Sequence, residues 1–245
     1  MALSSISISI ENNPYKGYID ITSNRNVSSL GNIAYIHIFH RQYNVSQSYQ
    51  KIYEIKVETL DDLDFIIHDY TCVAGLHYQY YIEVADGNQA GYTVLENETI
   101  SNVECYFEGL YIGNDTSQYM AHLNCSTDIA RNTQINYVNT LSGRTPYRVS
   151  NNNLNYTTGH SSGLFLQLDE NGNIISERNS SYEKEVIDFL TDGTSKIIKT
   201  SNGGMWYVSI DQEVDMSDDD KYAGMNLISF SWTEIGDVPV LRTVT

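Results

Sequence analysis

The hydrophobic pattern contains one segment with helical spacing, residues 181–190. Its apolar residues recur every three or four positions and so share one helical face: Tyr182, Val186, Phe189 and Leu190. Ser180 and Glu183 have the spacing of a capping box. Gly193 supplies a stop, because glycine adopts the left-handed conformation that a helix end requires. The pattern therefore predicts an amphipathic helix with one face that needs a partner.

Two strand-like runs follow this helix, Lys196–Thr200 and Met205–Ile210. They are separated by Ser201-Asn202-Gly203-Gly204, and Asn-Gly between two such runs is the strongest short hairpin signal. An isolated hairpin is only marginally stable in water. We therefore expect the helix and the hairpin to pack on a larger sheet supplied by the rest of the chain.

The first hundred residues alternate between apolar and polar positions, which is typical of half-buried strands. Turn residues separate the runs at the spacing expected of a β-sandwich. The pattern predicts seven strands here: Ser5–Glu11, Tyr18–Thr22, Ile33–His40, Tyr49–Glu58, Phe65–Tyr70, Tyr78–Val84 and Gly91–Leu95.

A second strand system begins near Glu98–Ser101, which predicts one domain over residues 1–100 and another over 101–245. Its strands include Gly163–Leu168 and Asn226–Thr233. The stretch Asn124–Val138 is too polar for a core, and we interpret it as a loop or an arm. The predicted fold class is mainly β, with a β-sandwich followed by a β-barrel or sandwich domain that carries the helix.

The charge balance narrows the function classes. The chain has 31 acidic and 14 basic residues and a net charge of −17. This balance disfavours binding to nucleic acid, because affinity for the phosphate backbone comes from Lys and Arg. No run approaches the roughly 20 apolar residues that span a membrane, and the N-terminus lacks signal-peptide features. We expect synthesis in a cytoplasm, no membrane insertion, and three reduced, buried cysteines (Cys72, Cys105 and Cys125).

Tyrosine is abundant, with 20 Tyr against 6 Phe and 2 Trp. Tyrosine is enriched at protein contact surfaces, and it also has high β-propensity. We give these two interpretations equal weight.

The segment from Asp69-Tyr70-Thr71 through Gly75-Leu76-His77-Tyr78-Gln79-Tyr80-Tyr81-Ile82 resembles the end of a fibronectin type III domain. The resemblance covers about Ser5–Asn102 and implies that Tyr78 is the tyrosine-corner residue, whose phenol reaches a backbone group upstream. The family's strand-B tryptophan is absent, and Tyr18 stands near its place. This resemblance implies a fold and not an activity.

The order of several short motifs in the second half is similar to that in tail or baseplate proteins of phages of Gram-positive bacteria. The motifs are Arg-x-Pro-Tyr, Asn-x-Asn-Tyr, Ser-Gly-Leu, Phe-Leu-Thr-Asp-Gly, Lys-Ile-x-Lys and Gly-x-Trp-x-Val, over about Ser101–Asp237. Each motif is weak alone, and their order carries the resemblance. It implies a distal-tail-like virion protein that is used in rings, and it names no catalytic residue.

Gly159-His160-Ser161-Ser162-Gly163 matches the G-x-S-x-G pattern of a nucleophile elbow. That elbow needs a strand before the serine and a helix after it, and here a strand follows. The hydrolase order also needs a histidine downstream, whereas all six histidines lie at or before residue 160. A Ser/Gly turn is the favoured interpretation.

Other groups of polar residues that resemble metal or catalytic sites have simple structural explanations. His37 and His40 lie three apart on a predicted strand, so they face opposite sides and cannot share a metal. The Asp215–Asp220 loop lacks EF-hand spacing. Adjacent helix positions diverge by about 100°, so Glu183 and Glu185 do not form a pair. We interpret these acidic residues as solvated surface charge. Asn-Gly turn chemistry explains a further ligand-like group: Asp169, Glu170, Asn171 and Asn173.

The sequence therefore predicts a non-enzymatic structural protein of a phage tail or baseplate, with no cofactor. It would be made in the host bacterial cytoplasm and would act in the virion by contacts with copies of itself and other tail proteins. Asn124–Val138 is the candidate arm, and a six-fold or three-fold ring is expected. Two alternatives remain open, a receptor- or carbohydrate-binding module at a tail tip and a hydrolase that uses Ser161.

Overall fold

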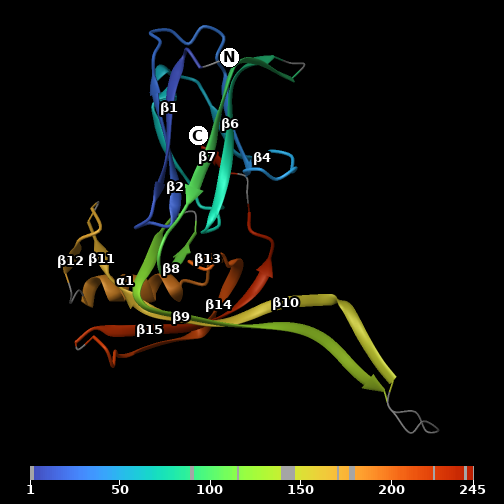
Figure 1. Ribbon diagram of the computed structural model, residues 1–245, viewed down its shortest axis with the longest axis vertical. Coiled ribbons are helices and arrows are strands. Elements are labelled where there is room, and N and C mark those ends of the chain that lie inside the picture. The colour runs from blue at the N-terminus through green and yellow to red at the C-terminus, as the bar shows by residue number, and fades with distance from the viewer. Residues whose placement is uncertain are drawn as a thin grey trace. The chain divides into compact units, whose positions relative to one another are not determined.

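The computed structural model describes residues 3–88, 91–114, 116–138, 147–169, 171–176, 180–222, 224–239 and 242–244. By contacts the chain divides into two compact units. Unit 1 comprises Met1–Glu108, Ser201–Gly204 and Val238–Thr245, and unit 2 comprises Gly109–Thr200 and Met205–Asp237. Strands dominate both units, and the described residues contain one α-helix (Figure 1). The predicted mainly β fold class with a single helix is confirmed.

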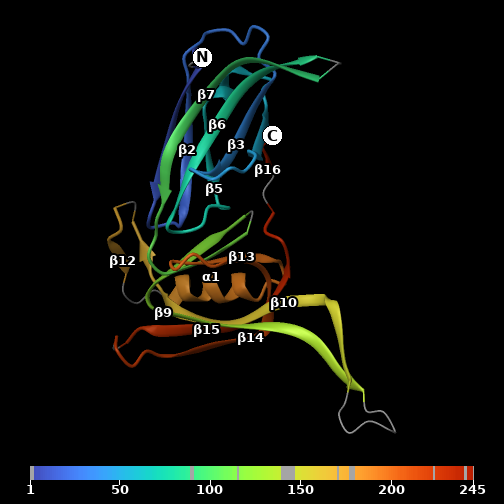
Figure 2. The same ribbon diagram turned by 45° about the vertical axis from the view of Figure 1, so that its right-hand side comes forward.

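Unit 1 contains two sheets (Figure 2). The first is antiparallel and three-stranded, in the order β1-β2-β5, and the second is five-stranded, in the order β16-β4-β3-β6-β7. A short 3-10 helix, η1 (Leu60–Leu63), precedes β5. The strands of unit 1 are β1 (Ile6–Asn13), β2 (Tyr18–Arg25), β3 (Tyr35–Gln42), β4 (Gln50–Lys56), β5 (Phe65–Asp69), β6 (Leu76–Asn88), β7 (Gly91–Cys105) and β16 (Arg242–Val244).

Alternation of apolar and polar residues explains which faces of these strands are buried. Ile19 and Ile21 of β2 are inaccessible to solvent, as are Ile36 and Ile38 of β3. Fully burying one such side chain contributes about 1.5–3 kcal/mol, so this register is strongly preferred over a shift by one residue. The seven strands predicted in this region are all present. Their ends differ by a few residues from the predicted ones, except that β7 continues past the predicted end at Leu95 to Cys105.

The division between the units differs from the sequence expectation at both ends. β7 runs through the predicted boundary near Glu98–Ser101 and stays paired with β6 up to Cys105, and the structural division follows Glu108. The chain end returns to unit 1, where β16 pairs in parallel with β4. Local patterns do not report such pairings, because the partners are far apart in sequence.

Unit 2 is a closed barrel in the order β10-β15-β14-β13-β8-β9. The sequence did not decide between a barrel and a sandwich. In the observed barrel the first and last strands of the sheet pair with each other, so the ring has no end strand. A two-stranded sheet of β11 (Gln167–Leu168) and β12 (Ile174–Ser176) lies outside the ring. The barrel strands are β8 (Leu110–Gly113), β9 (Gln118–Val138), β10 (Tyr147–Phe165), β13 (Lys196–Thr200), β14 (Met205–Asp218) and β15 (Asn226–Gly236).

The helix α1 (Ser180–Leu190) supplies part of the core of unit 2. Its predicted apolar face is confirmed: Val186, Phe189 and Leu190 are buried, and Tyr182 packs against the same cluster. Gly193 has a φ of 77°, as the predicted helix stop requires. The predicted capping box stays a prediction, since residues 177–179 lie outside the described residues, and the Glu183 carboxylate accepts a hydrogen bond from Asn226 Nδ2 at 2.9 Å.

The predicted hairpin after the helix is also present, with β13 and β14 paired through Ile198 and Trp206. β13 carries a fully buried cation, Lys196. Its Nζ donates to Asp192 Oδ1 at 2.6 Å and lies 4.3 Å from the centre of the Phe189 ring. Burial alone would raise the pKa of Asp192, but hydrogen bonds from Lys196 and Thr194 lower it below its ordinary value. The ion pair therefore ties the end of the helix to β13.

Gly159 of β10 packs directly against the indole of Trp232. A Cβ added at Gly159 would lie 2.2 Å from Trp232 Cζ2, whereas one added at Gly236 would meet no atom within 4 Å. Trp232 is fully buried, so it cannot swing away. We expect Gly159→Ala to lower the free energy of unfolding of unit 2 by about 1–3 kcal/mol through overpacking.

Urea denaturation followed by tryptophan fluorescence measures this effect, because Trp206 and Trp232 are the only tryptophans and both lie in unit 2. Gly236→Ala is the matched control and should stay within about 0.5 kcal/mol of the parent. Equal effects of the two substitutions would contradict the packing explanation.

Candidate assembly surface

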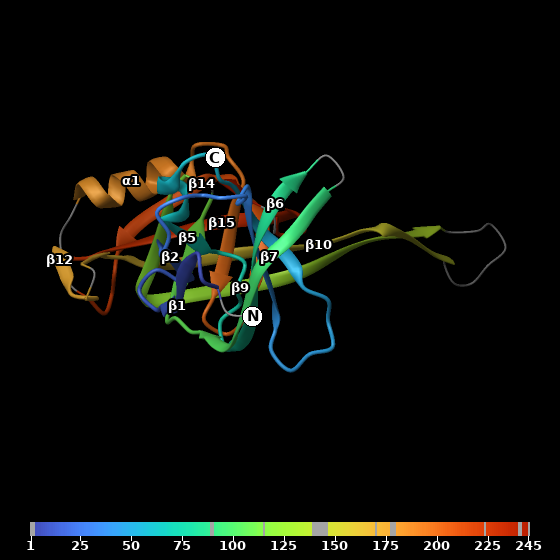
Figure 3. The ribbon, with the colours of Figure 1, turned by 90° about the horizontal axis from the view of Figure 1, so that it is seen from above.

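The longest strand pair of the protein, β9 with β10, belongs to the barrel only over part of its length. The pairing runs from Ala121 opposite Phe165 to Val138 opposite Tyr147. β15 pairs with β10 from Gly163 only as far as Thr158. Past that point the two strands continue together, away from the other barrel strands (Figures 1 and 3). We call residues 131–138 and 147–157 the arm.

The arm has two sheet edges with no neighbouring strand. Among the described residues, β8 pairs with β9 only over Gln118–Ala121, and β15 does not reach β10 beyond Thr158. A free edge exposes backbone N–H and C=O groups, which form a template for pairing with another chain. The arm is therefore a part of unit 2 where sheet pairing with a partner is geometrically available.

Side-chain hydrogen bonds hold the root of the arm. Arg131 Nε donates to Asn155 Oδ1 at 2.7 Å, and Asn132 Nδ2 donates to Thr158 Oγ1 at 2.7 Å. The backbone N–H of Thr157 donates to Glu234 Oε2 at 2.6 Å. The carboxylate of Glu234 thus accepts the N–H of the residue next to Thr158, where the pairing of β10 with β15 ends.

A groove of about 450 Å³ lies at the arm root, between the Asn155–Tyr156 segment and the end of β15. Tyr156 is 37% exposed and Ile235 is 49% exposed, and Ile129 on the neighbouring part of β9 is 58% exposed. Single exposed apolar residues are common on protein surfaces. Their position beside two free strand edges makes this region the candidate contact surface.

The structure divides the predicted segment Asn124–Val138. Asn124–Ala130 lies opposite the part of β10 that pairs with β15, so it belongs to the barrel wall. Residues 131–138 lie on the arm. The segment is polar because one end faces solvent from a barrel wall and the other lies on a two-stranded ribbon. Its arm interpretation therefore fits its distal half.

Tyr78 of β6 makes the kind of contact that the fibronectin-like resemblance implies. The backbone N–H of Val73 donates to the phenol oxygen of Tyr78 at 2.8 Å. The ring is buried, and this burial raises the pKa of Tyr78 well above its ordinary range. The bond ties the start of β6 to the preceding loop, and the tyrosine-corner role of Tyr78 stays a prediction.

Asp69 is the centre of a buried polar network that the sequence did not reveal. Its Oδ2 lies 2.8 Å from His40 Nδ1 and accepts a hydrogen bond from the Tyr80 hydroxyl at 2.7 Å. Its Oδ1 accepts from the Thr71 N–H at 2.8 Å and the Thr71 hydroxyl at 2.6 Å. The short Asp-x-Thr spacing predicts only the local Thr71 contacts, because His40 lies on a different strand.

His37 and His40 do not share a site, in agreement with the predicted strand geometry. His40 faces Asp69, whereas His37 Nδ1 lies 2.9 Å from Glu83 Oε1, and its ring meets that of Tyr92 edge to face with centres 4.6 Å apart. Both rings are buried. Because side chains alternate along a strand, the two histidines lie on different faces of the sheet.

The His40–Asp69 pair predicts a pH dependence of the stability of unit 1. Burial would lower the pKa of His40, but the charge of Asp69 raises it above 6.5. Burial would raise the pKa of Asp69, yet His40, Thr71 and Tyr80 hold it well below 3.8. The contribution of charged His40 to the stability of unit 1 is fully present below about pH 6.5 and is lost as pH rises through its raised pKa. The contribution of Asp69 is present above about pH 3.8 and is lost as pH falls through its lowered pKa.

We therefore expect unit 1 to be more stable at about pH 6 than at about pH 8.5. Hydrogen exchange of β3 and β5 amides, corrected for intrinsic rates, measures this difference. His40→Gln should flatten the profile over that range. A parent profile that is already flat would show that the pair does not titrate with folding.

Ser161 does not occupy a nucleophile elbow. It lies within β10, opposite Thr127 on one side and Phe230 on the other, and it is fully buried. Its hydroxyl oxygen accepts a hydrogen bond from Trp232 Nε1 at 2.9 Å. The strand–turn–helix geometry of the elbow is absent at this position, and the Ser/Gly turn interpretation is also wrong, because the segment is a continuous strand.

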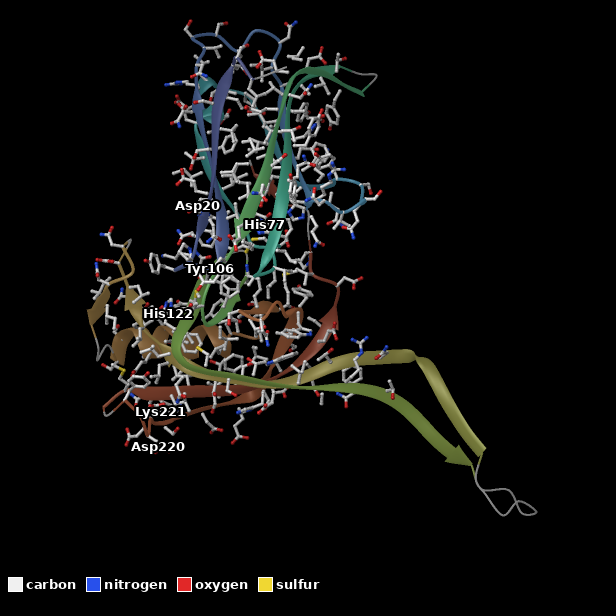
Figure 4. The ribbon with its side chains drawn as sticks, viewed as in Figure 1. Asp20, His77, Tyr106, His122, Asp220 and Lys221 are labelled. Atoms are coloured by element: carbon white, nitrogen blue, oxygen red, sulfur yellow. The ribbon has the colours of Figure 1, made fainter. Side chains whose placement is uncertain are left out.

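The predicted acidic loop Asp215–Asp220 is in part a strand. Asp215 and Asp218 lie within β14, and Asp219 Oδ1 accepts the backbone N–H groups of Lys221 and Tyr222, both at 2.8 Å. Asp220 and Lys221 lie at the turn itself (Figure 4). In the part of the chain that the structure describes, no group of three His, Cys, Asp or Glu residues is placed to hold a metal ion.

The remaining predicted sites are also explained by local structure. Asp169 Oδ1 accepts the N–H groups of Asn171 and Asn173 at 2.9 and 2.8 Å, which is turn chemistry. Glu170 lies outside the described residues. Cys72 and Cys105 are buried as expected, whereas Cys125 is exposed, contrary to the expectation.

No protein-family model matches this chain. No curated protein is significantly similar to it. Solved structures that are similar to this chain include two of gene transfer agent particles. A chain of "Virion of native gene transfer agent (GTA) particle" is 16% identical, with 52% of this chain and 92% of that chain covered and a TM-score of 0.31. A chain of "Tail of empty GTA particle computed with helical refinement, C6 symmetry" is 15% identical, with 54% and 93% covered and a TM-score of 0.33.

These similarities to gene transfer agent virion and tail chains concern the path of the backbone over about half of this chain. At such identity and TM-score they carry no argument about function. Candidate function therefore depends on the residues and geometry described above. Across the described residues, no helix is long and apolar enough to cross a membrane.

Proposed function

We propose that this chain is a structural subunit of a bacteriophage tail or baseplate, of the distal-tail type, and that it works by oligomeric assembly and not by catalysis. Its location would be the virion tail, after synthesis in the cytoplasm of a Gram-positive host. Its partners would be copies of itself and other tail proteins. The motif order over Ser101–Asp237 supports this proposal at the level of sequence.

The observation that carries the proposal is the arm, a two-stranded ribbon that leaves a closed barrel and has no strand paired to either edge among the described residues. The arm therefore offers edges at which unit 2 can pair with a neighbour. Identical subunits that each donate an arm and accept one form a head-to-tail contact, which closes into a ring when the rotation allows it. The expected ring is six-fold or three-fold.

We also propose that unit 1 is a fibronectin type III-like sandwich that acts as a contact module. Its two sheets contain the seven sequential strands β1–β7, and the Tyr78 hydroxyl contacts the backbone upstream of β6. This strand order supports the proposal, because fibronectin type III and immunoglobulin domains are sandwiches of two antiparallel sheets. Such domains support many functions, so we assign no activity to unit 1 on the basis of its fold.

The test replaces residues 133–155 with Asn-Gly. Asn132 and Tyr156 are opposite each other in the ladder, so a two-residue turn can join them. The barrel pairs from Thr158 inward are retained. We expect a folded monomer with an unchanged tryptophan fluorescence transition, and loss of the ring in native mass spectrometry and electron microscopy.

The structure makes this replacement a sharper experiment than deletion of all of Asn124–Val138, because that deletion would also remove a barrel wall. The matched control replaces Ile174 and Ile175, exposed residues of β12, with Ser and leaves the arm intact. Assembly by the armless variant would exclude the arm as the ring contact. Absence of the labelled parent chain from purified tails would refute the proposed function itself.

A further inference from the structure

A polar pocket of about 570 Å³ opens at one end of the β3–β4 hairpin in unit 1. Its walls come from the end of β3, the loop of residues 43–49 and the segment from Thr71 to Tyr78. Ligand sites typically have volumes of about 300–1,000 Å³. The pocket is therefore large enough for a small molecule of one or two rings.

The side chains around this pocket are unusual for so acidic a chain. The chain has 31 acidic and 14 basic residues, yet none of the lining residues is Asp or Glu. Arg41 and His40 are the basic residues of the wall. The charge of His40 is balanced by Asp69 behind it, at 2.8 Å. The pocket therefore carries the uncompensated charge of one guanidinium group.

Arg41 is held in place by neutral groups. Its Nε donates to Gln79 Oε1 at 2.8 Å, and its Nη1 donates to the backbone carbonyl of Gln47 at 3.4 Å. The guanidinium carbon lies 4.3 Å from the centre of the Tyr49 ring. In the described part of the chain, no carboxylate lies within 4 Å of this guanidinium. Its position is fixed while most of its N–H groups remain available, and a guanidinium so placed matches the geometry of a carboxylate or phosphate.

The other polar groups of the wall are hydroxyls and amides: Gln42, Ser46, Gln47, Ser48, Gln50 and Tyr78. They can donate and accept neutral hydrogen bonds. The Tyr78 oxygen already accepts from Val73, so its O–H remains a donor. A wall of this kind recognises a polyhydroxylated ring, and the single cation recognises one negative group on that ring.

We propose that this pocket binds an anionic sugar, with Arg41 contacting its carboxylate or phosphate and the amide and hydroxyl groups of the wall contacting its hydroxyls. The site lies wholly within unit 1 and does not depend on the arm. The inference is therefore independent of the proposed assembly function, and the armless variant described above should retain the binding.

The test is a calorimetric titration of the full chain with D-glucuronate, D-glucose 6-phosphate and D-glucose as probes. We expect saturable binding of at least one charged sugar, and at least about tenfold weaker binding of neutral glucose. The charged sugar that binds more tightly identifies the anionic group. Saturable binding of glucose with equal affinity would overturn the charge-based assignment, and no saturable binding of any probe would overturn the site.

Arg41→Gln keeps a polar side chain of similar length and removes the charge. We expect it to weaken binding of the charged sugar about tenfold or more, since a charge-assisted hydrogen bond is worth about 1.5–3 kcal/mol. Arg25→Gln is the matched control, because it changes the net charge equally at a residue that is ion-paired with Asp61 and Asp64. Equal affinity of the Arg41→Gln variant and the parent would contradict the proposal, provided that hydrogen exchange shows β3 and β4 intact.

Discussion

Asp69→Asn is expected to lower the free energy of unfolding of unit 1 by roughly 3–5 kcal/mol, the usual cost of removing one partner of a buried ion pair. The Asp69 side chain is 1% exposed and that of His40 is 6% exposed. Water therefore cannot solvate the His40 imidazole in place of the lost carboxylate. The amide that replaces the carboxylate has one oxygen where Asp69 has two, and the groups it must satisfy include the Tyr80 and Thr71 hydroxyls. Hydrogen exchange of amides in β3, β5 and β6 measures the change.

Asp61→Asn is the control for this experiment. Asp61 also forms an ion pair, with Arg25 at 2.7 Å, but its side chain is 88% exposed. Exposed pairs contribute about 0–1 kcal/mol, so the same chemical change should have little effect. If Asp69→Asn were as mild as Asp61→Asn, the buried network would not be a determinant of the stability of unit 1.

Trp232→Ala is expected to destabilise unit 2 by about 3–5 kcal/mol, the range for removal of a large buried aromatic side chain. Trp232 is fully buried in the cluster that α1 and the barrel strands share. Its ring packs against that of Trp206 at an interplanar angle of 37°, with centres 5.2 Å apart, and its Nε1 donates to Ser161. The substitution therefore leaves a cavity and removes a hydrogen bond. Trp206 remains as the fluorescent reporter for urea denaturation.

Two further variants separate the causes. Trp232→Phe retains an aromatic ring and removes the N–H, so it should cost less than Trp232→Ala and report the bond to Ser161. Ile235 lies on the same strand and is 49% exposed. Ile235→Ala should therefore change the free energy of unfolding of unit 2 by less than about 0.5 kcal/mol. A large effect of Ile235→Ala would mean that the end of β15 is covered by a partner in solution.

The buried face of α1 and the β13–β14 hairpin were predictable because their signals are local. Val186, Phe189 and Leu190 follow the helical period, and Asn202-Gly203 marks a turn whatever surrounds it. The strands of unit 1 were predictable for the same reason, since one buried face imposes a period of two residues. The isolated roles of His37 and His40 followed from strand geometry alone.

The arm could not be recognised as a strand ribbon from its residues. Both faces of a two-stranded ribbon are open to solvent, so no hydrophobic period distinguishes such a strand from a loop. The predicted segment Asn124–Val138 was therefore located correctly as a polar stretch, while its division between barrel wall and arm depended on where β15 stops pairing with β10. The free edges of the arm, on which the proposed function rests, come from that pairing.

The sequence alone determined the mainly β class, the single helix, the hairpin and most strand positions, because each of these depends on residues within a few positions of one another. Tertiary structure decided the closure of the barrel, the return of β16 to β4, the Asp69 network and the polar pocket beside Arg41. Each of these brings together residues far apart in the chain. Their partners are chosen by global packing and hydrogen-bond satisfaction, which a local pattern of side chains does not encode.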